Sequence, residues 1–468
     1  MAPNLLFVMS DDHASHAISA YGSRINRTPN IDRIAREGMR FDACFCTNSI
    51  CTPSRAAVLT GTYNHVNGVT TLDTPIDASL PTYVSALGEA GYQTAIFGKW
   101  HLGHGRGHDP VMFDEWAVLP DQGEYHDPVF LTAAGEVRVD GYATDVITDM
   151  ALEWLDRRDP DRPFALMVHH KAPHRPWEPD AAHADLYEDE EIPEPHTFWD
   201  DHATRSAAAA AVRMQMMDLT AEDLKQPVPE GLSADDEIRW RYQRYIKDYL
   251  RVVASIDDNV GRLLDRLDRD GLADDTVVVY TSDQGFFLGD HGWFDKRFIY
   301  EESLAMPLLV RYPREVVPGT ATDAMVLNVD FAPTFVDLAG LDVPAAMQGV
   351  SIRSVLRGAV PDDWRTSMYY RYWMHRDDAH LVPAHYGVRT HRHKLIYFYN
   401  DPMEQPGARP PADPPEWELY DLVEDPFEIH NVIDDPTYAA VRDDLRRELR
   451  RLQQAVGDEP HPSEGPLP

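Results

Sequence analysis

The sequence predicts an α/β protein with a large, doubly wound, mostly parallel (mixed) sheet flanked by helices, followed by a smaller α+β unit. Two observations predict the sheet: short apolar runs alternate with amphipathic segments, and each run stops abruptly at polar residues. A third predicts the smaller unit, because beyond about residue 360 four short strand-like runs precede one amphipathic segment. We therefore expect a main α/β domain at 1–360, with an insertion at about 177–237, and a C-terminal α+β domain with an antiparallel sheet at 361–468.

Four apolar runs in the first 300 residues have the composition of strands buried on both faces. They lie at 5–9, 93–97, 164–168 and 277–281. Continuous apolar runs of this length are typical of parallel sheets covered by helices on both sides. Because ligands bind at the carboxyl ends of such strands, we expect the polar residues after the four runs to converge.

Helical patterns fill the gaps between these strands. The predicted helices lie at 30–38, 82–91, 142–155 and 245–267. The last has apolar residues at near-helical spacing, and Gly271 lies beyond its end. The segment at 177–237 is acidic and proline-rich, and we expect it to cover the core and shape a cleft.

The C-terminal part is predicted to form strands and then a helix. The strands are expected at 368–373, 386–389, 394–399 and 417–422, and the helix at 439–456. The helix carries its apolar residues on one stripe, which is typical of a helix packed on a sheet.

The chain is strongly acidic, and its composition limits its partners. Its 468 residues carry a formal net charge of −35, which disfavours binding to nucleic acid and to anionic membranes. Lysine is scarce beside arginine, so the acidity reflects either a salt-loving host or a high-GC codon bias. No apolar run is long enough for a signal-peptide core or a membrane span, so we expect the chain as given to be cytoplasmic, unless a leader was removed. The oligomeric state is not predicted.

The most informative segment is Cys51-Thr52-Pro53-Ser54-Arg55, which is followed by a threonine and Gly61. Pro53 suits the first position of a helix, which would place Cys51 just ahead of a helix N-terminus that attracts anions. The alternative is a buried structural cysteine before an ordinary helix. The other two cysteines, Cys44 and Cys46, are expected to pack as small apolar residues, because a zinc site lacks a fourth ligand at the usual spacing.

Polar clusters follow the predicted strands. Asp11, Asp12, Asp283 and Gln284 supply the oxygen ligands that hard divalent cations such as Ca²⁺ and Mg²⁺ prefer. An isolated pair of aspartates is more often a turn or a helix cap, but two such clusters at the ends of buried strands favour a metal site. Three of the chain's lysines, Lys99, Lys171 and Lys296, lie in or beside these clusters.

These motifs together resemble the type I sulfatase family, the formylglycine-dependent branch of the alkaline phosphatase superfamily. The early Asp-Asp, Cys-Thr-Pro-Ser-Arg, Gly-Lys-Trp-His-Leu-Gly, Pro-His and Ser-Asp-Gln-Gly appear in the order of that family and span about residues 4 to 300. The segment Glu418-Leu419-Tyr420-Asp421-Leu422 is similar to its C-terminal domain. Gln284 departs from the Asn or His that many relatives carry, although its amide oxygen can still bind a hard cation.

The resemblance implies a role for each candidate residue. The enzyme would be a sulfuric ester hydrolase in which Cys51 is oxidised by a formylglycine-generating maturation enzyme to an aldehyde that works as its hydrate. Calcium, or magnesium, would be bound by Asp11, Asp12, Asp283, Gln284 and the modified residue 51. Arg55 and Lys99 would neutralise charge, His174 or Lys296 would protonate the leaving oxygen, and His101 would assist release of sulfate. Lys171 is a weaker candidate for a substrate contact.

Several segments also resemble sulfatases of sulfated sugars, above all the N-acetylglucosamine-6-sulfatase group. They are Phe113-Asp114-Glu115-Trp116, Leu119-Pro120-Asp121-Gln122-Gly123 and Lys171-Ala172-Pro173-His174-Arg175. Trp177, His104 and His108 could line the cleft, or could equally be packing or surface residues. Two alternatives stay open: a phosphonate monoester or phosphodiester hydrolase of the same superfamily, and a non-catalytic glycan-binding relative. A phosphatase with a cysteine nucleophile is disfavoured, because Ala57 occupies the position six residues after Cys51 where an arginine is needed.

Overall fold

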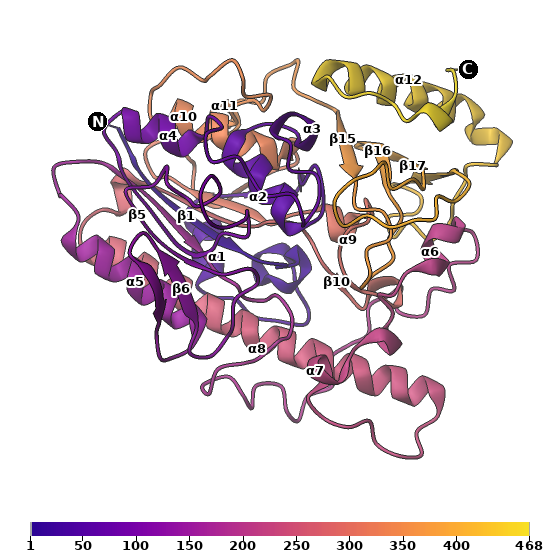
Figure 1. The fold of residues 1–468 in the computed structure, drawn as a ribbon, viewed down its shortest axis with the longest axis horizontal. Coiled ribbons are helices and arrows are strands. Elements are labelled where there is room, and N and C mark those ends of the chain that lie inside the picture. Colours follow the sequence, from indigo (N-terminus) through magenta and orange to yellow (C-terminus); the bar gives the residue numbers. More distant parts are fainter. Residues whose placement is uncertain (1, 468) are drawn as a thin grey trace.

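A computed structural model describes residues 2–467, and a ten-stranded mixed sheet forms its centre (Figure 1). Four parallel strands lie side by side in the middle, in the order β9 (Thr276–Ser282), β1 (Asn4–Ser10), β8 (Phe164–His169) and β4 (Gln93–Lys99). They are the four predicted strands, each longer than predicted by one or two residues. The predicted fold class is confirmed.

Short strands extend the sheet on both sides, and none of them was predicted. Beside β4 lie β5 (Glu115–Leu119), β6 (Val129–Thr132) and β7 (Gly135–Arg138). Beside β9 lie β12 (Leu308–Arg311), β2 (Met39–Phe41) and β13 (Thr320–Thr322). Antiparallel pairing of β12 with β9, and of β6 with both of its neighbours, makes the sheet mixed.

Helices cover both faces of the sheet. One face carries α1 (Ile31–Glu37), α5 (Ala143–Arg157) and α8 (Ala234–Arg269), and the other carries α2 (Cys51–Thr60), α4 (Tyr83–Glu89) and α10 (Phe331–Leu338). Alternate residues of β1 point to opposite faces of the sheet. Leu6 and Val8 pack in the core under α5 and α8, and Phe7 packs in the core under α2 and α10. This two-sided burial explains the continuous apolar runs.

The predicted helices are present, but the prediction at 245–267 was too short. The helix α8 begins at Ala234, because Ser233 caps it by accepting a hydrogen bond from the N–H of Asp236. Its first turn carries three acidic residues and is mostly exposed, so no apolar stripe marks it in the sequence. The segment before α8 contains the short helices α6 (Ala207–Ala211) and α7 (Ala221–Leu224) and one 3-10 turn at Met216–Asp218. The domain and insertion boundaries remain predictions.

The C-terminal part forms a four-stranded antiparallel sheet, as predicted. Its strands are β15 (Ser367–Tyr372), β16 (His385–Thr390), β17 (His393–Phe398) and β18 (Glu416–Asp421), and α12 (Ala439–Val456) packs on it. Leu395 and Leu449 belong to the same apolar core as Phe7 of the large sheet. The two sheets therefore share one continuous core.

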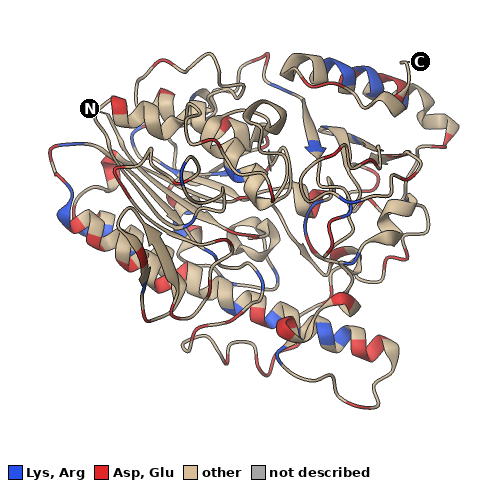
Figure 2. Ribbon diagram, viewed as in Figure 1, with Lys and Arg blue, Asp and Glu red and all other residues tan. Residues whose placement is uncertain are grey.

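Short elements connect these layers. They are β3 (Cys44–Phe45), α3 (Asn64–Asn67), β10 (Phe287–Leu288), β11 (Phe294–Asp295), α9 (Glu301–Leu304), β14 (Val326–Leu327) and α11 (Arg353–Leu356). Acidic residues are spread over the outer helices and loops (Figure 2). No helix within residues 2–467 combines the length and apolar character needed to cross a membrane.

Candidate active site

The carboxyl ends of β1 and β9 bring three acidic side chains together. Ser10 lies opposite Ser282 in the sheet, so Asp11 and Asp283, which follow them, are neighbours. Asp12 has a left-handed backbone with φ of 70°, and its N–H donates to Asp283 Oδ1 at 3.2 Å. One oxygen of each aspartate lies within 4.8 Å of the others, and all three residues are buried. The polar residues after these strands therefore lie together, as the sequence predicts.

Cys51 is the first residue of α2, and the predicted helix start was wrong by two residues. The first intrahelical bond runs from the N–H of Ser54 to the carbonyl of Ile50 at 3.0 Å, so Pro53 is the third helical residue. Proline is tolerated there because the N–H groups of a first helical turn have no acceptor within the helix. Cys51 thus lies inside the first turn and not ahead of it.

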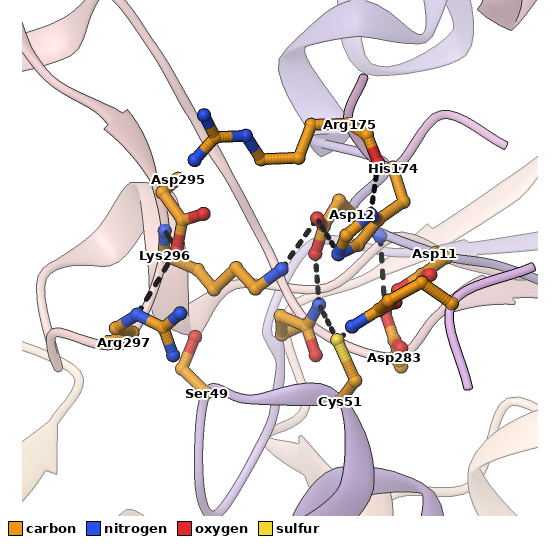
Figure 3. A network of polar contacts seen from close by, with 12 residues as sticks. Asp11, Asp12, Ser49, Cys51, His174, Arg175, Asp283, Asp295, Lys296 and Arg297 are labelled. Carbon is orange, nitrogen blue, oxygen red and sulfur yellow. Dashed lines mark hydrogen bonds and ion pairs between the residues drawn. The ribbon is translucent and has the colours of Figure 1, made fainter. Parts of the chain in front are cut away.

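The Cys51 thiol lies against the aspartates. Its Sγ atom is 3.4 Å from Asp11 Oδ1 and 3.8 Å from Gln284 Nε2, and the residue is 1% exposed (Figure 3). Burial, and then repulsion from Asp11, raises the pKa of the thiol far above its ordinary value. The thiol is therefore protonated and donates a weak hydrogen bond to Asp11. Cys44 and Cys46 are also buried free thiols, and they pack in the apolar core as predicted.

Three cations face the three carboxylates, each with one short contact, and Arg55 Nη2 also lies 3.8 Å from Asp11 Oδ1. The pairs are Arg55 with Asp283, Lys99 with Asp11, and Lys296 with Asp12. Arg55 Nε donates to its carboxylate at 2.9 Å, and Lys296 Nζ donates at 2.6 Å. We call these six residues the strand-end cluster. The sequence predicted all six as site residues, and the structure brings them together.

The carboxylates of this cluster do not ionise equally. Burial would raise the pKa of Asp11, but the charges led by Lys99 hold it well below its usual range. Burial raises the pKa of Asp12 to about 6 although Lys296 opposes it, and burial with repulsion from Asp11 raises that of Asp283 to about 7. Adjacent buried carboxylates thus resist full ionisation, and a bound cation would relieve this cost.

The donor atoms fit a hard divalent cation. Besides the three carboxylates, Gln284 reaches the same gap, where its Nε2 donates to Asp12 Oδ1 and its Oε1 is buried without a hydrogen-bond partner. A half-turn of the amide would present that oxygen to the carboxylates. An all-oxygen set of this kind is what Ca²⁺ and Mg²⁺ prefer. The residues present therefore fit such an ion.

Two histidines lie beside the cluster. His174 places Nε2 at 3.8 Å from Asp12 Oδ2, and its Nδ1 lies 2.7 Å from the carbonyl of Arg175. His101 places Nδ1 at 3.4 Å from Thr52 Oγ1, beside residue 51. Burial, and then the charge on Lys99, lowers the pKa of both imidazoles well below their ordinary values. Both rings are therefore neutral.

Sequence reasoning missed residues that hold the lysines. Gln122, in the loop after β5, accepts from Lys99 Nζ at 2.5 Å. Lys296 lies between Asp295 and Arg297, both with left-handed backbones at φ of 78° and 90° (Figure 3). Arg297 Nη2 lies 2.7 Å from Nδ1 of His380, which comes from the C-terminal part of the chain. In the sequence, only the position of Arg297 next to Lys296 indicates that Arg297 could help to hold the lysine. The contact with His380 is tertiary and leaves no sequence signal.

Other candidates lie outside the cluster. Lys171 Nζ sits 4.5 Å from the Tyr125 ring centre, and burial, with repulsion from Lys99, lowers its pKa to about 8. Trp177 is fully buried with its ring 4.5 Å from that of Tyr245, so it packs in the core and does not line a cleft. His104 and His108 make hydrogen bonds to backbone groups of the surrounding loops.

Comparison with known protein families gives two matches. The model for the family described as Sulfatase matches residues 3–341, and the model described as N-sulphoglucosamine sulphohydrolase, C-terminal, matches residues 289–455. An N-acetylglucosamine-6-O-sulfatase of Bacteroides thetaiotaomicron is 41% identical, over 97% of this chain and 87% of its own length. The N-acetylglucosamine-6-sulfatase of Homo sapiens is 28% identical, over 79% of this chain and 67% of its own.

Solved structures share the whole fold. One, a complex with its substrate D-glucosamine-2-N,6-O-disulfate, superposes with a TM-score of 0.91 at 40% identity and covers 100% of both chains. The phosphonate monoester hydrolase of Agrobacterium radiobacter superposes with a TM-score of 0.76 at 22% identity, over 97% of this chain and 96% of its own. The second likeness concerns the fold alone.

Proposed function

The chain belongs to the sulfatase family and is a sulfuric ester hydrolase, and from this premise we propose its substrate and its mechanism. We infer that it hydrolyses the 6-O-sulfate ester of a glucosamine-type sugar. We further infer that residue 51 acts as formylglycine beside a divalent cation, most simply Ca²⁺.

The substrate is supported by likeness along the whole chain. The 41% identical relative is an N-acetylglucosamine-6-O-sulfatase, and the solved structure with a TM-score of 0.91 holds a 6-O-sulfated glucosamine. Both matches extend over the C-terminal sheet as well as the large sheet. The phosphonate monoester hydrolase is much less similar in sequence, so it gives no comparable support for the rival substrate class.

The observation that carries the mechanism is the 3.4 Å contact between Cys51 Sγ and Asp11 Oδ1 inside the strand-end cluster. Burial beside a carboxylate disfavours the thiolate, which is the reactive form of cysteine. The thiol is therefore poorly suited to act as a nucleophile itself. Conversion to formylglycine, whose hydrate offers a hydroxyl in the same place, would supply the missing nucleophile, and it implies a formylglycine-generating enzyme as a partner.

The oxygen atoms of Asp11, Asp12, Asp283 and Gln284 would hold the cation. When bound, such an ion polarises the oxygens of a sulfate ester and lowers the cost of charge that develops on them. Arg55 and Lys99 face the same gap as fixed positive charges and would neutralise the anionic group that reacts there.

Lys296 is better suited than His174 to protonate the leaving oxygen. Its ammonium carries three N–H donors, of which one is used on Asp12. His174 Nδ1 lies 2.7 Å from a carbonyl and must carry the ring proton, so Nε2 faces the cluster with a lone pair. His101, next to Thr52, would assist the step that restores position 51 after sulfate leaves.

Kinetics on matched substrates tests this proposal. We expect the protein to hydrolyse N-acetylglucosamine-6-sulfate, and an aryl sulfate more weakly, with little turnover of an aryl phosphodiester. A faster reaction with the phosphodiester would instead identify a phosphonate monoester or phosphodiester hydrolase. Glycan binding without turnover, in protein whose residue 51 carries the aldehyde, would identify a non-catalytic relative.

A further inference from the structure

Cys51, His174 and Asp11 form a second set of metal ligands that shares one residue with the all-oxygen set. One sulfur, one ring nitrogen and one carboxylate oxygen lie within 4.8 Å of one another, and all three residues are buried. Sulfur and imidazole nitrogen are ligands that Zn²⁺ prefers, whereas Ca²⁺ and Mg²⁺ prefer oxygen alone. The chemical state of residue 51 therefore decides which class of ion the site suits.

We propose that the unconverted chain binds Zn²⁺ through Cys51 Sγ, His174 Nε2 and Asp11 Oδ1, and that conversion of residue 51 removes this site. The loss of the site on conversion rests on the proposed function, whereas zinc binding by the thiol form does not depend on it. The ion replaces the thiol proton, which leaves to solvent, so no oxidant or reductant takes part.

The orientation of His174 favours metal binding. Its Nδ1 lies 2.7 Å from the carbonyl of Arg175, which fixes the tautomer and leaves the lone pair on Nε2. A hydrogen bond of this kind to the outer nitrogen is the usual support of a zinc-binding histidine. In Figure 3 the His174 ring lies beside Asp12. His174 is 7% exposed, so its ring is held by its surroundings.

Asp11 can bind an ion without losing its partner. Its Oδ2 is paired with Lys99, while its Oδ1 faces Cys51 Sγ at 3.4 Å and lies 3.8 Å from Arg55 Nη2, beyond hydrogen-bond distance. Tetrahedral zinc with bonds of about 2.0–2.3 Å separates its ligand atoms by about 3.3–3.8 Å. The sulfur and oxygen already stand at that separation, so only the His174 ring has to move closer. A water can complete the four ligands.

The two ions would exclude each other, because both need Asp11. The thiol of Cys51 is 1% exposed, so a chain that folds before conversion keeps it out of reach of another protein. Zinc would stabilise that unconverted form by binding only the folded state. Converted chains, which lack the sulfur ligand, would take the hard cation instead.

The test uses the full chain in its thiol form, produced without a converting enzyme and checked by mass. Co²⁺ serves as the probe, because thiolate coordination gives a charge-transfer absorption, and Zn²⁺ is then titrated to displace it. We expect one Co²⁺ per chain with this absorption. His174→Ala should weaken binding at least about tenfold, and Cys51→Ser should abolish the absorption. The matched control is Cys46→Ala, which removes another buried thiol and should change neither.

The proposal is overturned if the folded thiol form lacks the absorption, or if His174→Ala leaves binding unchanged. Should Cys51→Ser fail to fold, the converted wild-type protein gives the second comparison, since it must lack the absorption. Failure of the proposed function has a different signature, namely converted protein that does not hydrolyse the sulfate ester in the absence of zinc.

Discussion

The molecule contains two largely buried networks of salt bridges. Comparing them shows how a functional site differs from a network that only stabilises the fold. The strand-end cluster lies at the carboxyl ends of β1, β4 and β9. The second group, which we call the α9 cluster, joins α9 to the C-terminal sheet through Glu301, Glu428, Lys394 and Arg389. In both groups carboxylates and cations are equal in number.

The difference lies in where the atoms point. Lys394 sits between the two glutamates at 2.8 Å from each, and Arg389 Nη2 lies 3.0 Å from Glu301. The α9 cluster is built from glutamates, a lysine and an arginine, whereas the strand-end cluster also holds the thiol of Cys51 and the side-chain amide of Gln284, which contact its carboxylates. Among residues 2–467, trios of possible metal ligands within 4.8 Å occur only around Asp11. A buried salt-bridge network alone therefore does not indicate a metal site. The convergence of different kinds of ligand atom does.

The largest effect is expected at Cys51. Cys51→Ala removes the group from which the nucleophile is made, so kcat/KM for the sulfate ester should fall at least about 10⁴-fold. The melting temperature should change little, because the lost side chain is small. Turnover within tenfold of wild type would contradict the account of the strand-end cluster.

The α9 cluster should give the opposite result. Lys394→Met leaves the buried Glu428 carboxylate without its cation and the half-buried Glu301 with Arg389 alone, and it should lower the free energy of unfolding by about 3–5 kcal/mol. The kcat of the protein that remains folded should stay within about twofold of wild type. Lys225→Met is the matched control, because this exposed lysine pairs with Asp248 and its loss should cost about 1 kcal/mol or less. Equal melting temperatures for the two variants would show that the α9 cluster stabilises the fold no more than an ordinary surface ion pair does.

A cation titration sharpens the comparison further. Ca²⁺ at 100 times its dissociation constant should raise the free energy of unfolding by about 2.7 kcal/mol. Asp283→Asn removes a ligand and should abolish most of this increase, whereas Glu428→Gln, in the α9 cluster, should preserve it. The measurement is thermal unfolding with and without a chelator, and an equal shift in both variants would place the ion elsewhere.

Lys171 belongs to neither cluster and gives the smallest effect. Burial, then repulsion from Lys99, lowers its pKa from 10.5 to about 8, so the folded chain binds its proton more weakly than the unfolded chain. The free energy of unfolding should therefore rise with pH between about 8 and 10.5. Lys171→Met should remove that rise. It should also raise the free energy of unfolding at pH 7 by about 2 kcal/mol, a net figure that already subtracts the lost contact with Tyr125. Unfolding measured across this pH range checks it, and an unchanged slope would count against it.

The same contrast explains what the sequence could predict. The central strands were found to within two residues, because burial on both faces produces unbroken apolar runs that end in polar residues. The edge strands, such as β7 with all residues exposed, carry no such signal. The first turn of α8 is likewise acidic and mostly exposed, so the start of this helix was not visible in the sequence.

The site was predictable where a residue type carries chemistry by itself. The aspartates, lysines and Arg55 stood at strand ends or within motifs, and the structure brings them together. His380 was missed and Gln122 was noted only within a family-like segment and given no role, because both side chains act through tertiary contacts. The first-turn position of Cys51 was missed because proline fits any of the first helical positions.

The central claim is that residue 51, held against Asp11, carries the reacting group. The most direct test is the mass of the peptide that contains residue 51, taken from several active preparations, together with their turnover of N-acetylglucosamine-6-sulfate. The account predicts the mass loss of a thiol converted to an aldehyde, with turnover proportional to the converted fraction. An unmodified cysteine in fully active protein would contradict it.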